Sequence, residues 1–326
     1  METSFLVQTL ASVVASSTPV VLASIGETIS EKSGVTNLSL DGSIALSAMT
    51  GFAVAFLTGS VWLGMGAAML VGALVASIVA YASISLGLEQ VAVGFVLTML
   101  CADLADFLGN DFVRKPGPTM PHAPVPFLSE IPILGPILFN HSWVVYISIL
   151  AVAASWWWIY KTQPGLKLRG VGERPESAFA RGVDVKAVRY LYTALGGALV
   201  GLAGASYSLS IKLGWSHGHT SGIGWIALAI VIFGGWHPGR VLGGSYLFGL
   251  LKALGSILQR NPAFSSVPTQ VFSSAPFALM IFALLLVHNE GVDRLLALLP
   301  ARLGRQLDRA IRGRPPAALG KTFTQD

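Results

Sequence analysis

Residues Lys161–Arg189 read KTQPGLKLRGVGERPESAFARGVDVKAVR, and this polar stretch separates two long apolar segments. It holds seven of the 21 Lys and Arg residues, whereas most of the surrounding chain is apolar enough to lie in lipid. Charged side chains are costly inside a bilayer, so the stretch predicts a water-exposed loop within a membrane protein. A short helix of small and charged residues in such a loop would let a membrane subunit grip a soluble partner.

The composition favours an all-α membrane protein. Hydrophobic residues make up 53% of the chain and charged residues 11%, with a mean hydropathy of +0.67, whereas a soluble domain carries roughly 25% charged residues. The single cysteine, Cys101, lies in an apolar run, which excludes a disulfide framework and a thiolate metal site. No basic region precedes the first apolar segment, so we expect a retained first helix instead of a cleaved signal peptide.

The apolar segments are long enough to cross a bilayer, which takes about 20 residues of helix. We expect about nine spans (eight to ten) in a transmembrane domain covering residues 1–299. Ile223–Trp236 is short and a Gly-Pro break follows it, so it could be a broken or half-spanning helix. The expected spans are Phe5–Ile25, Leu38–Leu57, Val61–Leu86, Val91–Leu108, Trp143–Tyr160, Tyr190–Ile211, Ile223–Trp236, Val241–Leu258 and Val271–Val287.

The distribution of Lys and Arg predicts the orientation. Three of these residues precede residue 161, seven lie in residues 161–189 and seven follow Gly291. Cytoplasmic loops carry the excess of positive charge, so the loop and the C-terminal tail should be cytoplasmic. The proline-rich loop 110–142 then lies outside, together with the N-terminus. Arg114 and Lys115 oppose this scheme, and a tenth span or a re-entrant stretch near Glu27–Asn37 would reverse the N-terminus.

The tail, residues 300–326, is basic. In Pro300–Arg314, Leu303, Leu307 and Ile311 recur every four residues among arginines, which predicts an amphipathic helix on an anionic membrane surface. We expect Pro315–Asp326 to be disordered.

The chain shows no convincing motif for catalysis, nucleotide binding or metal binding. Gly320-Lys321-Thr322 resembles the end of a P-loop, but Pro315 stands where that motif needs glycine. His217-Gly218-His219 has no carboxylate or thiol near it in the sequence, so a wet external loop is favoured over a metal site. We therefore expect no enzymatic activity and no cofactor bound by this chain.

Three segments carry a family resemblance. Thr18–Gly42, TPVVLASIGETISEKSGVTNLSLDG, resembles the N-terminal signature of permease subunits of bacterial ABC importers in the branched-chain amino acid, simple sugar and nucleoside group. Leu168–Gly204 and Gly222–Gly235 are similar to that family's cytoplasmic coupling segment and to a third recurrent stretch. The pattern is closest to the nucleoside (guanosine-type) permeases, and it covers about residues 15–290.

The chain departs from the family pattern at a few positions. Asp41-Gly42 stands for the usual Glu-Gly, Arg174 for Asn, and Ser177-Ala178 for Ala-Ala. These departures leave the resemblance intact. They put in doubt only the detailed contacts that the resemblance implies for these positions.

The resemblance implies the partners. It predicts a multi-pass subunit of the bacterial cytoplasmic (inner) membrane that works with a second permease (a paralogue or a second copy), with cytoplasmic ATPase subunits that bind ATP and Mg, and with a periplasmic or lipid-anchored substrate-binding protein. Membrane lipids are further partners, and nucleic acid is not. The alternatives are a simple-sugar permease and, from another class, an ion-driven secondary transporter.

Within this picture a short cytoplasmic helix, Glu173–Gly182, transmits motion from the ATPase. Pro175 suits the first turn of a helix, Glu176 complements its dipole, and Gly182 can end it. An ordinary basic loop is the alternative. The expected coupling residues are Gly172, Glu173, Arg174, Pro175, Ala178, Arg181 and Gly182.

The translocation path is expected where polar and ring-bearing residues meet the spans. Polar groups in membrane segments usually face a cavity, although bonding to backbone at helix ends is equally compatible. If Asn37 and Asp41 are helical, they share a face. Phe95, Trp215 and Trp225 could stack a base or sugar ring, or anchor the chain at the membrane interface. The expected path residues are Glu27, Asn37, Asp41, Gly42, Phe95, Gly222, Gly224 and Trp225.

Overall fold

A computed structural model describes residues 2–260, 267–268, 270–271, 274, 278 and 313–323, and these residues form helices and loops without strands. The all-α membrane class is therefore confirmed. Seven helices in this part of the chain are long and apolar enough to cross a bilayer. They are α1 (Glu2–Lys32), α2 (Leu40–Thr58), α3 (Val61–Ala80), α4 (Gln90–Gly109), α5 (Trp143–Lys161), α8 (Val185–Ser206) and α10 (Pro238–Gln259). Single π-helical turns, Tyr81–Ser85 and Tyr207–Ile211, extend α3 and α8.

Two of the nine expected spans are not among these seven. Helix α9 (Ile223–Phe233) has 11 residues, which is about 16 Å of helix against a hydrocarbon thickness of about 30 Å. It corresponds to the half-spanning alternative. The expected span Val271–Val287 lies outside the described residues except at 271, 274 and 278.

The first helix is longer than the sequence predicted. It continues past Ile25 to Lys32, so Glu27 and Glu31 lie on its last turns and not in a connecting loop. The chain leaves this helix at Gly34, whose φ of 96° is the left-handed conformation that glycine adopts readily.

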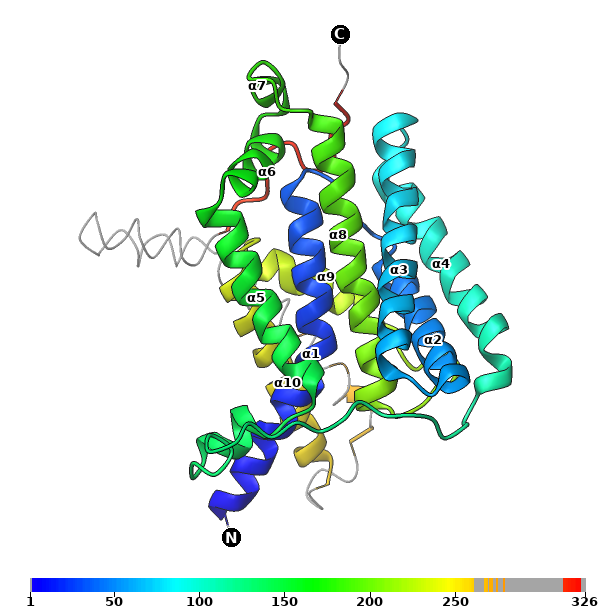
Figure 1. Ribbon diagram of the computed structural model, residues 1–326, viewed down its shortest axis with the longest axis vertical. Helices are drawn as coiled ribbons and strands as arrows, with labels where there is room; N and C mark the ends of the chain where they lie inside the picture. Colours follow the sequence, from blue (N-terminus) through cyan, green and yellow to red (C-terminus); the bar gives the residue numbers. More distant parts are fainter. Residues whose placement is uncertain are drawn as a thin grey trace, which may run out of the picture.

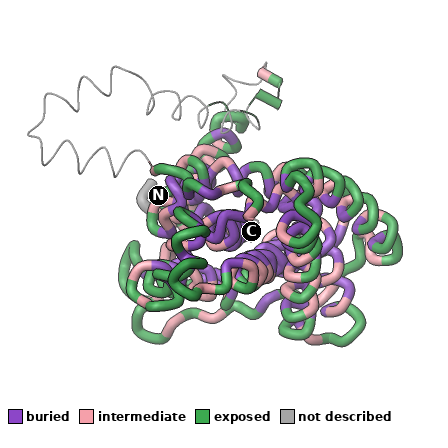
Figure 2. Tube along the Cα trace, turned by 90° about the horizontal axis from the view of Figure 1, so that it is seen from above, coloured by how far each residue is buried: buried purple, intermediate pink, exposed green. Residues whose placement is uncertain are grey.

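Small residues let the central helices approach closely. A Cβ atom on Gly26 of α1 would lie 2.4 Å from the Gly196 carbonyl oxygen of α8, and one on Gly72 of α3 would lie 2.2 Å from the Gly197 carbonyl oxygen. Such faces are common where lipid supplies no hydrophobic drive for helix association. Figure 2 shows buried segments in the middle of the bundle and exposed ones around its rim.

The polar loops occupy opposite ends of the bundle. Helices α6 (Gln163–Glu173) and α7 (Pro175–Phe179) lie at one end, and loop 110–142 and the N-terminus lie at the other (Figure 1). The tail residues 313–323 lie at the α6–α7 end, where the Ala318 N–H donates to the Gly172 carbonyl at 2.9 Å. Our expectation of disorder from Pro315 is therefore wrong for residues 315–323, and the amphipathic helix Pro300–Arg314 falls outside the described residues except at 313 and 314.

Candidate functional site

The polar loop 161–189 forms two short helices in place of the single helix Glu173–Gly182 that we expected. Arg174 separates them with φ −146° and ψ 80°, because a residue that precedes proline is driven out of the helical region. Pro175 then begins α7 and Glu176 lies in its first turn, as the sequence predicted. Helix α7 ends at Phe179, three residues before Gly182, which turns the chain with φ 79°.

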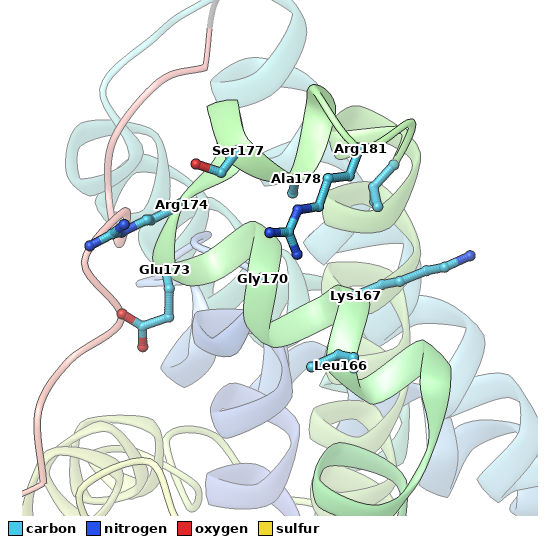
Figure 3. Close-up of a pocket in the computed structure, with 9 residues that line it drawn as sticks. Leu166, Lys167, Gly170, Glu173, Arg174, Ser177, Ala178 and Arg181 are labelled. Atoms are coloured by element: carbon cyan, nitrogen blue, oxygen red, sulfur yellow. The ribbon is translucent and has the colours of Figure 1, made fainter.

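A groove of about 440 Å³ lies between α6 and α7 (Figure 3). Apolar side chains form part of its wall, and charged side chains surround them. The cations outnumber the single carboxylate, and none of these charges forms an ion pair within the described part of the chain. The groove therefore presents an apolar hollow with a positive rim. Its lining residues are Leu166, Lys167, Gly170, Glu173, Arg174, Ser177, Ala178, Arg181 and Val183.

The expected coupling residues occupy different positions around this groove. Glu173, Arg174, Ala178 and Arg181 line it. Gly172 is buried behind it, where a Cβ atom would lie 2.1 Å from the Lys32 carbonyl oxygen. Pro175 is buried as well, and Gly182 is exposed beside the groove. Gly172 thus packs α6 against the end of α1 and does not face outward.

Asp41 joins two segments that are far apart in the sequence. Its Oδ1 accepts a hydrogen bond from the Gly224 N–H at 2.9 Å, and its Oδ2 accepts one from the Gly222 N–H at 3.2 Å. Both donors are at the N-terminus of α9, where backbone N–H groups lack partners within the helix and a carboxylate complements the helix dipole. Asp41 therefore fixes the start of the half-length helix.

The other expected path residues near Asp41 come together with it. The rings of Phe95 (α4) and Trp225 (α9) lie 5.4 Å apart between centroids and are 47% and 36% exposed. A Cβ atom on Gly42 would lie 2.2 Å from the Thr98 carbonyl oxygen, one helical turn from Phe95. Six of the eight expected path residues thus form one cluster where α2, α4 and α9 meet.

Glu27 and Asn37 form a separate, deeper cluster. The Asn37 N–H donates to Glu27 Oε1 at 2.8 Å, and Glu27 is fully buried. Asn37 precedes α2, so it shares no helical face with Asp41. One turn along α1, buried Glu31 accepts a hydrogen bond from the Trp236 indole N–H. Glu31 was not among the residues expected from the sequence, although its four-residue spacing from Glu27 places both on one face of a helix.

Three residues singled out in the sequence have other surroundings. Trp215 is buried 4.7 Å from the His219 ring, between centroids, so it does not stand ready to stack a ligand. His217 Nδ1 lies 3.2 Å from Asp106 Oδ1, a carboxylate that is distant in the sequence. Burial lowers the pKa of His219. No group of three or more metal-ligating side chains occurs among the described residues.

An apolar helical bundle with a structured polar loop at one end defines an integral membrane protein. Comparison with known families supplies the class. Residues 9–284 match the family described as the permease component of the branched-chain amino acid transport system, and the chain belongs to this family. It is therefore a multi-pass protein of the cytoplasmic membrane, and the ion-driven alternative is overturned. Membership implies an ATPase and a substrate-binding protein as partners in general terms.

Similar proteins carry names that specify substrates. The chain is 40% identical over 255 residues to TsgC13 of Haloferax volcanii, provisionally named a glucose ABC transporter permease protein, covering 77% of this chain and 78% of the relative. It is 36% identical over 280 residues (82% and 87%) to the guanosine ABC transporter permease protein NupQ of Bacillus subtilis. It is 32% identical over 287 residues (85% and 90%) to the nucleoside ABC transporter permease protein NupC of Lactococcus lactis. No solved structure matches significantly.

Proposed function

We propose that this chain is the membrane-spanning subunit of an ATP-driven importer of nucleosides, paired with a second permease subunit. The observation that carries the substrate class is the similarity to two relatives named for guanosine and nucleosides, over 82% and 85% of this chain. The hydrolysis of ATP belongs to partner subunits in this proposal.

The α6–α7 groove is the proposed contact with the ATPase. Its apolar hollow would take an apolar side chain of the partner, and its three cations against one carboxylate favour acidic or carbonyl groups around that side chain. Hydrogen bonds to charged groups are the stronger ones at such contacts.

The cluster of Asp41, Phe95 and Trp225 is the proposed part of the translocation path. The two rings are partly exposed on this chain, so a second permease subunit would complete the passage around them. Nucleobases offer π-faces on which aromatic side chains stack. Asp41 is assigned to holding α9, because both of its carboxylate oxygens already accept hydrogen bonds.

Uptake measurements test the substrate class. Deletion of the gene should abolish high-affinity uptake of labelled guanosine and leave uptake of ribose and glucose intact, and the wild-type gene should restore it. Binding of nucleosides, sugars and amino acids to the partner binding protein supplies an independent readout. Loss of sugar uptake with nucleoside uptake intact would contradict the proposal.

A sugar importer is the second candidate, because the relative provisionally named for glucose is 40% identical over 77% of this chain. The same uptake panel distinguishes the two candidates. Loss of glucose uptake alone would select this one.

The substitution Ser177→Trp tests the coupling contact. Ser177 is exposed and lines the groove, so an indole there would fill the groove without entering the membrane bundle. Gly182 is less suitable, because its φ of 79° makes any side chain there strain the backbone. We expect normal membrane levels and a loss of substrate-stimulated ATP hydrolysis and of uptake.

Ala187→Trp is the matched control. Ala187 is exposed on the first turn of α8 and lies outside the groove lining. It should transport like the wild type. If the Ser177→Trp variant still shows wild-type stimulation of ATP hydrolysis, the groove is not part of the ATPase contact.

A further inference from the structure

The tail residues 313–323 cross the same end of the bundle as the α6–α7 groove, and they contact several of the elements that meet there. The Gly320 N–H donates to the Gly34 carbonyl between α1 and α2 at 3.1 Å, and the Ala318 N–H donates to the Gly172 carbonyl of α6 at 2.9 Å. The Phe323 ring lies 5.9 Å from the Phe179 ring of α7, between centroids. In Figure 3 the tail is the thin pale red ribbon beside Glu173 and Arg174.

These contacts satisfy groups that would otherwise lack partners. Gly172 lies in the last turn of α6, where the backbone carbonyls have no N–H donor within the helix. Arg189 of α8 is 2% exposed, and its Nη1 donates to the Lys321 carbonyl at 2.9 Å. Its Nε and Nη2 have no hydrogen-bond partner in the described part of the chain. Because an unpartnered buried cation is costly, the tail backbone stabilises the position of Arg189.

The fit of the tail is close. Ala318 is 4% exposed, and its carbonyl oxygen would lie 3.1 Å from a Cβ atom on Gly34. At the other end, Gly313 approaches Gly235, after α9, so closely that a Cβ atom on Gly235 would lie 2.4 Å from the Gly313 Cα. The segment therefore lies against the α9–α10 turn, α6, the α1–α2 turn, α7 and α8.

Helix α7 has few neighbours, whereas α6 also packs against α5, α8 and the end of α1. Helix α7 is connected to the bundle through Arg174 on one side and through the turn at Gly182 on the other, and its described neighbours are α6, α8 and the tail. The α1–α2 turn contains Asn37 and is followed by Asp41, so it is continuous in the chain with both polar clusters. The tail is a physical link between the groove and that turn.

We infer that residues 313–323 form a strap that positions the α6–α7 groove relative to the α1–α2 turn, so that movement at the groove reaches the polar clusters. The inference rests on the proposed ATPase contact and adds a positioning segment to it. The strap stays docked while the bundle moves, because its hydrogen bonds hold both elements at once.

Two neighbouring alanines allow a matched test. Ala318→Trp should displace the strap, since Ala318 is buried, whereas Ala317→Trp should not, since Ala317 is exposed. Each variant is assembled with its ATPase, second permease and binding protein. Ala318→Trp should keep its membrane level and co-purify with the ATPase, but lose about fivefold or more of substrate-stimulated ATP hydrolysis and uptake, the low end of usual coupling between sites. Ala317→Trp should match the wild type.

If Ala318→Trp shows wild-type stimulation of ATP hydrolysis, the strap is refuted. Loss of the Ala318→Trp protein from the membrane would also refute it, because the segment would then act in folding. A cysteine pair, Phe179→Cys with Phe323→Cys in a Cys101→Ser background, gives a second test. A short thiol crosslinker should join the pair in membranes, and the joined protein should still couple. Absence of crosslinking, or inactivation by it, would refute a strap that stays docked.

The outcome separates the strap from the proposed ATPase contact. If Ser177→Trp uncouples transport while Ala318→Trp behaves like the wild type, only the strap is refuted. If Ser177→Trp also behaves like the wild type, the groove itself is not the ATPase contact.

Discussion

At the scale of single residues, the carboxylate of Asp41 shows how a charge can lie within an apolar bundle. Its two oxygens accept the Gly222 and Gly224 N–H groups, so the negative charge meets the positive end of α9. Gly224 permits the approach, since a Cβ atom there would lie 2.3 Å from the Asp41 backbone nitrogen. A residue that the sequence offered as a path residue therefore has a structural task.

Asp41→Ala should weaken the start of α9. Removing a helix N-terminal acceptor costs about 0.5–2 kcal/mol, so the thermal unfolding temperature of the purified protein in nanodiscs should fall. Asp41→Asn keeps one acceptor oxygen, so its unfolding temperature should fall less than that of Asp41→Ala. Asp103→Ala, at an exposed position on α4, is the control, and equal unfolding temperatures for Asp41→Ala and Asp103→Ala would contradict this role.

At the scale of elements, α3 and α8 meet through glycine. Gly197 and Gly201 of α8 face Gly72, Ala68 and Ala76 of α3. Two glycines four residues apart lie on one face of a helix, which lets the two helix backbones approach closely. Two further Gly-x-x-x-Gly spacings, Gly235–Gly239 and Gly239–Gly243, have different surroundings. Gly235 lies outside a helix, and a Cβ atom on Gly243 would meet nothing within 4 Å.

Substitutions of two glycines of α3 distinguish the effect of helix packing on stability from the effect of helix propensity. Gly72→Ala would bring a Cβ atom to 2.2 Å from the Gly197 carbonyl oxygen, whereas one on Gly66 would meet no atom within 4 Å. Overpacking of this kind costs about 1–3 kcal/mol, so Gly72→Ala should lower the unfolding temperature. Gly66→Ala should not lower it. If both variants unfold at the wild-type temperature, α3 and α8 are not packed as described.

At the scale of the whole molecule, the two polar loops are at opposite ends (Figure 1). The loop that contains α6 and α7 carries the excess of Lys and Arg, and from the positive-inside rule we predict that this end is cytoplasmic. The tail lies at the same end through its bonds to Gly172 and Gly34, as the charge distribution predicted.

Cysteine labelling in intact cells checks this orientation. In a Cys101→Ser background, a cysteine at exposed Ser177 should react only with a membrane-permeant reagent, and one at exposed Glu130 should also react with an impermeant reagent. Both variants should transport, which shows that they are folded. Equal reactivity of the two positions toward the impermeant reagent would reject the topology.

The helical membrane class, the positions of most spans and the polar loop with a helix that begins at Pro175 could all be predicted from the sequence. Hydropathy, charge and proline act over a few neighbouring residues, so these features can be read locally. The break at Arg174 followed from the same local chemistry, although our single-helix expectation overlooked the effect of a following proline. The family resemblance added the partners.

Contacts between residues that are distant in the sequence could not be predicted in this way and are seen in the folded chain. Asp41 and Gly224 are 183 residues apart in the chain, and the pairing of Ala318 with Gly172 joins the tail to a loop in the middle of the sequence. Residues 315–323 were expected to be disordered because this part of the tail has no apolar periodicity. It is ordered by backbone hydrogen bonds to the carbonyls of Gly172 in α6 and Gly34 in the α1–α2 turn. No sequence pattern marks those carbonyls, since every residue has one.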